Sequence, residues 1–289
     1  MLAIYKKELK SYFHNMTGYI FIALMLLIVG IIFTATNLKN GYPNFEYTLI
    51  NDIVIIALLI LFPILTMQSL AEERRSKTDQ LLFSLPMSMK KIVLAKYLAM
   101  LTVFLIPTAL FALYPLVLTG FGTIALGSAY STLVGFFFMG AVMIAIGLFM
   151  SSLTESQIIA AVLSFGALLL IYLMTALASL VPATSLFSLL ALAALAAVVG
   201  LFIYYMTQNT TAAVVVSAVL IFGLLAVYWI DASLLEGAFS RMMTSLSVID
   251  RFRDFANGVF DLGAVIYDLS LIVLFVFFSM QTVEKRRWS

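Results

Sequence analysis

The sequence lacks cysteine altogether, contains one histidine, and is poor in charge, with charged residues at only 10% of its 289 positions. Without cysteine there is no disulfide framework and no thiolate metal site. The single histidine, His14, is not accompanied by a cluster of acidic residues, so we interpret it as an interfacial side chain and not as a metal ligand. A net charge of only +2 excludes a broad nucleic-acid-binding face.

Enzymatic signatures are missing as well. No segment matches the phosphate-binding pattern G-x-x-x-x-G-K-S/T, so the chain itself is not expected to hydrolyse nucleotide. The serines of the apolar segments have no histidine near them, and the acidic residues fall at segment ends, so no nucleophile–base pair or carboxylate pair is evident. We therefore predict no catalytic residue, metal site or cofactor site in this chain.

Hydrophobic residues, in contrast, make up 64% of the sequence, and the mean hydropathy is +1.13. A soluble chain is about half apolar and about a quarter charged, whereas crossing a bilayer takes roughly 18 or more apolar residues in a row. The sequence therefore predicts an all-α integral membrane protein, a polytopic helical bundle with eight spans. The spans are expected at 17–37, 50–70, 92–118, 130–150, 157–180, 185–206, 212–231 and 265–283.

Two spans raise questions of geometry. The third, 92–118, is long enough to require tilt or a kink, for which Pro107 and Pro115 are the candidate positions. Only a short uncharged separator divides 185–206 from 212–231, so this pair could instead be a re-entrant hairpin, which leaves six spans. Both arrangements place the N- and C-termini in the cytoplasm, because twelve of the 16 lysines and arginines then lie on that side.

Residues 1–14 are expected to form an amphipathic helix along the cytoplasmic membrane surface. Its anchors are three lysines that lie off the apolar face. These anchors are Lys6, Lys7 and Lys10, and the predicted apolar face consists of Leu2, Tyr5, Leu9, Tyr12 and Phe13.

The cytoplasmic loop 71–91 is expected to carry a short helix between two spans. Ser76 precedes Asp79 by three residues, a spacing typical of a capping box, and Pro86 should end the helix. Its apolar ridge can pack against the protein's own helix ends or dock in a groove of a cytoplasmic partner, and the pattern does not separate the two.

Outside the membrane, residues 232–264 are expected to form amphipathic helices, with breaks at Gly258 and Gly263. An ion-coupled carrier would need ionisable residues buried within its spans. The nearest candidates lie within a turn or two of a span end, so we expect them to be solvated caps. They are Asp52, Glu155, Asp231 and Asp268.

Two stretches of the sequence resemble the permease subunits of ABC-2-type exporters, and most nearly the gliding-motility-type and multicopper-enzyme-maturation-type permeases. The first is "LAEERRSKTDQLLFSLPMSMKKIVLAKYLA", from Leu70 to Ala99, and the second is the final span with its terminal "EKRRWS". The positions of the first stretch that match the family's pattern are Glu73, Arg75, Thr78, Leu81, Leu82, Leu85, Pro86 and Lys96.

The resemblance implies a mechanism and a set of partners. Two permease chains, identical or related, would form the export pathway in the bacterial cytoplasmic membrane, and two copies of a separate ATPase subunit would bind ATP and magnesium. An accessory extracytoplasmic protein is a further partner that such systems allow. The segment 76–85 would be the coupling helix that the ATPase pushes. The residues implied in this coupling are Glu72, Glu73, Arg74, Arg75, Thr78, Leu81, Leu82, Leu85 and Pro86.

Two other functions stay open at this point. A secondary carrier that needs no ATPase should show intramembrane charges and internal repeats, and neither is evident in the sequence. A membrane scaffold that recruits partners without transporting anything is compatible with the composition. The transported substrate does not follow from the sequence.

Overall fold

The computed structural model describes residues 1–39, 44–78, 88–256 and 261–287, and all regular structure in these ranges is helical. Eight of these helical segments are long and apolar enough to cross a membrane, which agrees with the predicted number of spans. They are Thr17–Lys39, Asp52–Arg75, Met89–Leu118, Leu126–Leu153, Gln157–Leu180, Ser185–Tyr205, Thr210–Ile230 and Leu262–Lys285.

The chain divides into two compact units, and the larger comprises residues 1–169 and 251–289. Its helices in chain order are α1 (Leu2–His14), α2 (Thr17–Phe33), the π-helical continuation η1 (Thr34–Lys39), α3 (Glu46–Ile50), α4 (Asp52–Arg75), α6 (Met89–Phe111), α7 (Tyr114–Leu118), α8 (Leu126–Leu153) and α14 (Leu262–Arg287), together with the first part of α9 (Gln157–Leu180) and most of α13 (Val248–Ala256).

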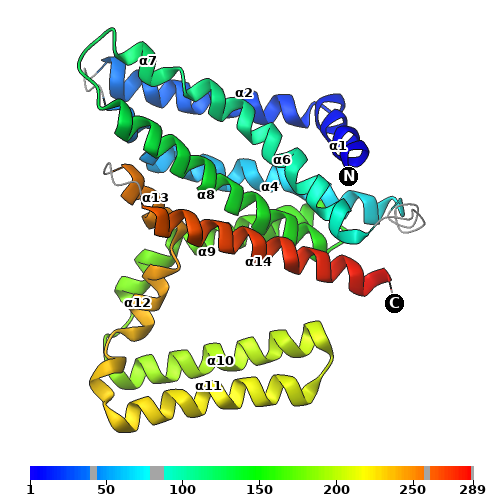
Figure 1. The fold of residues 1–289 in the computed structure, drawn as a ribbon, viewed down its shortest axis with the longest axis vertical. Helices are drawn as coiled ribbons and strands as arrows, with labels where there is room; N and C mark the ends of the chain where they lie inside the picture. Colours follow the sequence, from blue (N-terminus) through cyan, green and yellow to red (C-terminus); the bar gives the residue numbers. More distant parts are fainter. Residues whose placement is uncertain (40–43, 79–87, 257–260, 288–289) are drawn as a thin grey trace. The chain divides into compact units, whose positions relative to one another are not determined.

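Helix α8 forms the centre of this unit and packs against α4, α6 and α14 (Figure 1). Glycines make this close packing possible. A Cβ atom at Gly140 would collide with the ring of Phe104, and one at Gly147 would collide with the side chain of Thr66. Aromatic rings fill the core between the helices, with Phe104 at 5.1 Å from Phe62 and 5.8 Å from Phe136 between ring centroids.

The long third span is interrupted at one of its two prolines. Helix α6 continues through Pro107, but the chain leaves the helix at Ala112 and Leu113 before α7 begins, with Pro115 as its second residue. Proline is tolerated in the first turn of a helix, where its missing N–H has no partner to lose. The predicted break therefore lies beside Pro115.

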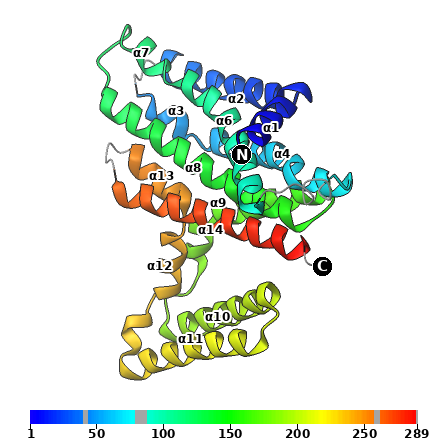
Figure 2. The ribbon, with the colours of Figure 1, turned by 45° about the vertical axis from the view of Figure 1, so that its right-hand side comes forward.

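The smaller unit, residues 170–250, contains the helical hairpin of α10 (Ser185–Thr207) and α11 (Thr210–Ile230). The two helices lie side by side in both views (Figures 1 and 2). The turn uses Gln208 in the left-handed conformation, and Asn209 caps α11 by accepting a hydrogen bond from the Ala212 amide. Each helix is as long as a full span, which favours eight spans over the re-entrant alternative.

The predicted amphipathic segment after this hairpin is helical where the structure describes it. It consists of η2 (Ala232–Leu235), α12 (Ala238–Ser245) and α13. Asp231 caps η2 by accepting hydrogen bonds from the hydroxyl and amide of Ser233, and these bonds lower the pKa of its carboxyl. The predicted break at Gly258 lies outside the described residues, and Gly263 lies in the first turn of α14 instead of between helices.

Candidate functional site

The most constrained polar site of the larger unit surrounds Lys96, in the second turn of α6. Its side chain is 1% exposed, and its Nζ lies 3.0 Å from Glu8 Oε1 of α1 and 2.8 Å from Glu73 Oε1 of α4. The same ammonium group donates a hydrogen bond of 2.8 Å to the carbonyl of Ser69. All three ammonium protons therefore have acceptors. We call these four residues the Lys96 cluster, and the end of the bundle that holds it the α1 end.

Burial determines how strongly the cluster holds its three helices together. A buried charge is tolerated only when it is paired and hydrogen-bonded, and removing one partner leaves the other charge uncompensated. Lys96 is the shared partner of two carboxylates whose side chains are only 11% and 16% exposed, those of Glu8 and Glu73. Separating α1, α4 or α6 at this end would therefore leave a buried charge without its partner.

Helix α1 is attached to the bundle by further hydrogen bonds on either side of Glu8. The Tyr12 hydroxyl donates to the carbonyl of Leu65 at 3.3 Å, and the Tyr5 hydroxyl lies 2.9 Å from that of Thr102. Burial raises the pKa of Tyr12, and the nearby carboxylate of Glu8 raises it further, so the hydroxyl stays a neutral donor. Helix α1 is therefore a packed element of the protein.

The predicted helix over residues 1–14 is confirmed, one side of it packs inside the protein, and its place along the membrane surface stays a prediction. Ile4, Glu8 and Tyr12 are buried, whereas Leu2 is 67% exposed. The physical reason is that α1 packs against α2 and α6, and its polar contacts turn the line of Glu8 inward. Hydrophobic spacing alone could not identify that line, because it contains a carboxylate.

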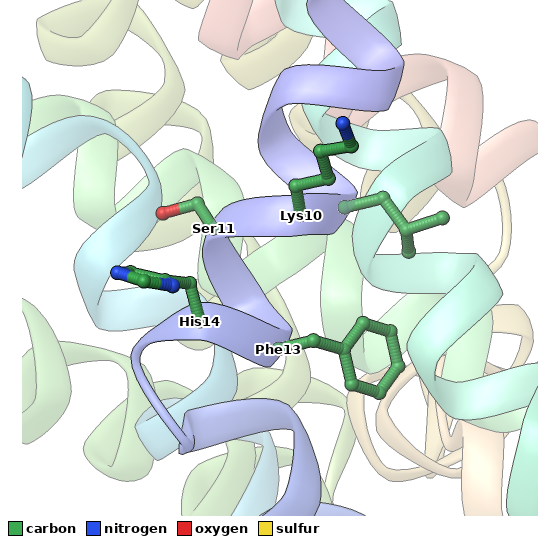
Figure 3. A pocket seen from close by; sticks show the side chains of 5 residues that line it. Lys10, Ser11, Phe13 and His14 are labelled. Atoms are coloured by element: carbon green, nitrogen blue, oxygen red, sulfur yellow. The ribbon is translucent and has the colours of Figure 1, made fainter.

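The exposed flank of α1 carries the predicted anchors Lys6, Lys7 and Lys10. A shallow hollow of about 600 Å³ lies along this flank, and Figure 3 shows that Ser11 and His14 point to one side of the helix and Phe13 to the other. The residues that line the hollow belong to α1. This surface therefore suits contact with a boundary between polar and apolar surroundings better than it suits the binding of one enclosed ligand. The lining residues are Leu9, Lys10, Ser11, Phe13 and His14.

The charged segment after the second predicted span is not the start of a loop. Residues Glu72–Arg75 form the last turn of α4, so the prediction that they lie in the loop 71–91 is wrong. Glu72 and Arg75 are exposed, but Glu73 pairs with Lys96 and Arg74 is only 8% exposed. Two of the four charges implied in partner docking therefore face the protein's own interior.

Helix α4 ends in a Schellman motif. The amide of Thr78 donates to the carbonyl of Glu73, and the amide of Lys77, at φ 55°, donates to that of Arg74. Ser76 occupies the C-cap, and its hydroxyl donates to the carbonyl of Glu72 at 2.8 Å. Ser76 therefore closes the preceding helix, and the other member of the predicted capping box, Asp79, lies outside the described residues.

The rest of the predicted coupling helix lies outside the described residues. This applies to Asp79, Leu81, Leu82, Leu85 and Pro86. The structure does establish where this segment is attached: it leaves the Schellman motif at Thr78, directly after the last turn of α4, and returns at Ser88, before α6. Both attachment points therefore flank the two helices that carry Glu73 and Lys96.

The four acidic residues that are predicted to be solvated caps differ in their exposure. Asp52 is exposed and pairs with the exposed Arg253 at 3.0 Å, and Glu155 and Asp231 are also exposed, as expected. Asp268 is only 3% exposed, and its Oδ1 has no hydrogen-bond partner among the described residues, so the prediction of a solvated cap is wrong there. The reason is that Asp268 lies one turn after the buried Ala264, on the side of α14 that packs into the larger unit.

Within the described ranges, no three histidine or acidic side chains gather as metal ligands would. Several apolar helices joined around a buried ion-pair cluster, with two charged helix ends beside it, define the class as a multi-pass membrane protein. A model of the ABC-2 family transporter proteins matches residues 26–187, more than half of the chain. The chain belongs to this family and is a permease component of an ABC transporter. No curated protein matches the chain.

The family match covers the helices from α2 to the start of α10, and with them Glu73 and Lys96. Glu8, the third charge of the Lys96 cluster, lies before the matched region. The narrower resemblance to gliding-motility-type and multicopper-enzyme-maturation-type permeases stays a prediction.

Proposed function

We propose that this chain is the permease subunit of an ATP-driven exporter, that two permease chains form the pathway, and that a separate ATPase subunit docks at the α1 end. The observation that carries the proposal is the position of the Lys96 cluster. It lies directly beside the two points where the segment between α4 and α6 is attached. That segment is the one that the resemblance assigns to ATPase contact.

The cluster supplies a path for force from the docked ATPase. A push on the segment reaches the last turn of α4, where Glu73 holds Lys96 of α6, and Lys96 in turn holds Glu8 of α1. Because these charges are buried, they resist separation more strongly than exposed ion pairs do. Helices α1, α4 and α6 therefore respond together at this end, as transmission of the push into the bundle requires.

This proposal also implies how the chain is oriented in the membrane and where ATP is hydrolysed. The α1 end, with the N-terminus, lies in the cytoplasm of a bacterium, where ATP is available and where most lysines and arginines then lie. ATP and magnesium bind to the partner ATPase. Of the residues implied in coupling, the described ones that are exposed to that partner are Glu72, Arg75 and Thr78.

The experiment is co-purification of this chain with the ATP-binding-cassette ATPase encoded beside it. Leu82→Asp should reduce the amount of bound ATPase at least tenfold, because a charge on the apolar ridge would have to be buried at the contact. The matched control is Leu234→Asp, at an exposed leucine of η2 in the other unit, which should leave binding unchanged. Unaltered ATPase binding by Leu82→Asp, or transport by a preparation free of ATPase, would refute the proposal.

A further inference from the structure

One stretch of α4 has its backbone contacted by side chains from three other helices. The carbonyls of Leu65, Met67 and Ser69 each accept a hydrogen bond from a side chain. In an uninterrupted α-helix, each carbonyl is satisfied by the amide four residues later. The side-chain donors are Tyr12 of α1, Ser151 of α8 and Lys96 of α6.

Ser151 makes the most unusual of these contacts, because it touches both partners of one helical hydrogen bond. Its Oγ donates to the carbonyl of Met67 at 3.3 Å and accepts from the amide of Ala71 at 3.1 Å. It also accepts from the amide of Leu70 at 3.2 Å. A hydroxyl group has one proton and two lone pairs, so all of its bonding capacity is used on α4.

The close approach of α8 to α4 positions this hydroxyl. Gly147 lies one turn before Ser151 on α8, and its hydrogen leaves room for Thr66 where a Cβ atom would collide. In α4, one turn before Met67, Pro63 has no amide proton to donate to the carbonyl of Leu59. The backbone of α4 is thus weakened at Pro63 and shared with Ser151 at Met67–Ala71. Side chains that insert into the hydrogen-bond ladder are a recognised cause of helix bending.

We propose that the turn Met67–Ala71 is a hinge of α4 and that Ser151 is the positioning residue that allows it to open. When the charged end of α4 moves, the bond between Met67 and Ala71 lengthens, and the Ser151 hydroxyl keeps both groups satisfied. In a lipid environment an opened turn without such a partner would be strongly disfavoured. The hinge separates the intramembrane part of α4, held by α8, from the last turn, held by Lys96.

This inference rests on the proposed function, because an ATPase must supply the motion. The absence of cysteine from the chain allows spin labels to be placed at chosen pairs of positions. One pair, Glu72→Cys with Leu153→Cys, reports on the exposed ends of α4 and α8 near the hinge. The other pair, Ile56→Cys with Val134→Cys, reports on the same two helices on the far side of the hinge.

The measurement is double electron–electron resonance on the permease–ATPase complex, with and without a non-hydrolysable ATP analogue. The analogue should shift the distance between positions 72 and 153 and leave that between 56 and 134 unchanged. Ser151→Ala should abolish the shift, whereas Ser152→Ala should retain it, because among the described residues the Ser152 hydroxyl bonds to Phe149 of its own helix and not to α4. Ser151→Thr keeps the hydroxyl group and should retain the shift as well.

The possible results are distinguishable. If the ATPase binds and hydrolyses ATP but both label pairs move together, or neither moves, the hinge is refuted and the proposed function stands. A normal shift in Ser151→Ala also refutes the role of Ser151. If Ser151→Ala does not assemble, the two label pairs are compared in the wild type and in Ser151→Thr, and this comparison still decides whether the turn is a hinge. Failure of the ATPase to associate with the unlabelled wild-type permease refutes the proposed function, and the hinge with it.

Discussion

Lys96 Nζ lies 2.8 Å from Glu73 Oε1, within hydrogen-bonding distance and away from solvent. The pair joins the second turn of α6 to the last turn of α4, across the segment in which the coupling helix is expected. The same ammonium group holds Glu8 of α1 at 3.0 Å. These contacts connect the N-terminal helix to the part of the permease that is expected to receive the force of ATP binding.

Lys96→Met should destabilise the protein by about 3–5 kcal/mol, because it leaves the carboxylates of Glu8 and Glu73 buried without a cation. Thermal unfolding of the purified protein in detergent measures this loss. Lys90→Met changes an exposed lysine of the same helix and should shift stability by no more than about 0.5 kcal/mol. Equal effects of the two substitutions would show that the cluster does not hold the helices together.

Glu8→Gln should loosen α1 while leaving the spans folded, because it removes one of the contacts that attach this helix to α6. The expected result is faster amide hydrogen exchange in residues 2–14, with little change in α8. Glu72→Gln serves as the control, since this glutamate is exposed at the end of α4. Unchanged exchange in α1 after Glu8→Gln would mean that Tyr5 and Tyr12 suffice to hold it.

Gly147→Ala should cost about 1–3 kcal/mol, because the added methyl group collides with Thr66 and forces α4 and α8 apart. Gly166→Ala in α9 is a matched control, since beyond the adjoining backbone of α9 no atom of the described residues lies within 4 Å of a Cβ placed there. That control should be neutral or slightly stabilising, as alanine is the better helix former. A thermal unfolding series of the two variants decides the point, and a neutral Gly147→Ala would contradict the close packing.

Asp268→Asn should leave the protein at least as stable as the wild type at pH 8, because a buried carboxylate oxygen without a partner disfavours the folded state. Asp52→Asn, at an exposed position, should change stability by less than about 0.5 kcal/mol. Thermal unfolding of both variants is again the measurement. A marked loss of stability in Asp268→Asn would reveal a favourable interaction of that carboxylate.

The sequence predicted the helices well because a span requires only length and apolar composition, and segments such as Leu126–Leu153 satisfy both. Side-chain partners were harder to predict. Lys96 was noted as a position that matches the family pattern, yet its ion pairs to Glu8 and Glu73 join residues far apart in the chain. Hydropathy does not show how neighbouring helices are aligned, so it could not predict that these residues are in contact.

Three other positions show which physical information was missing. Ser151 looks like any small residue of an apolar span, and its role depends on the backbone of α4 against which it packs. Glu8 lies beside the predicted apolar face of α1, and hydrophobic spacing does not show that it faces a buried cation. Asp268 was misplaced because hydropathy does not show which side of α14 faces the protein, and Asp268 lies on the same side as the buried Ala264.

The central claim is that the ATPase binds where α4 ends, and site-specific cross-linking tests it most directly. A photo-reactive amino acid at Thr78, exposed and next to the predicted coupling helix, should form an adduct with the co-expressed ATPase. The same group at Leu234, exposed in η2 of the other unit, should form none. An adduct at Thr78 alone is the predicted result, whereas equal adducts at both positions, or an adduct at Leu234 alone, would contradict the account.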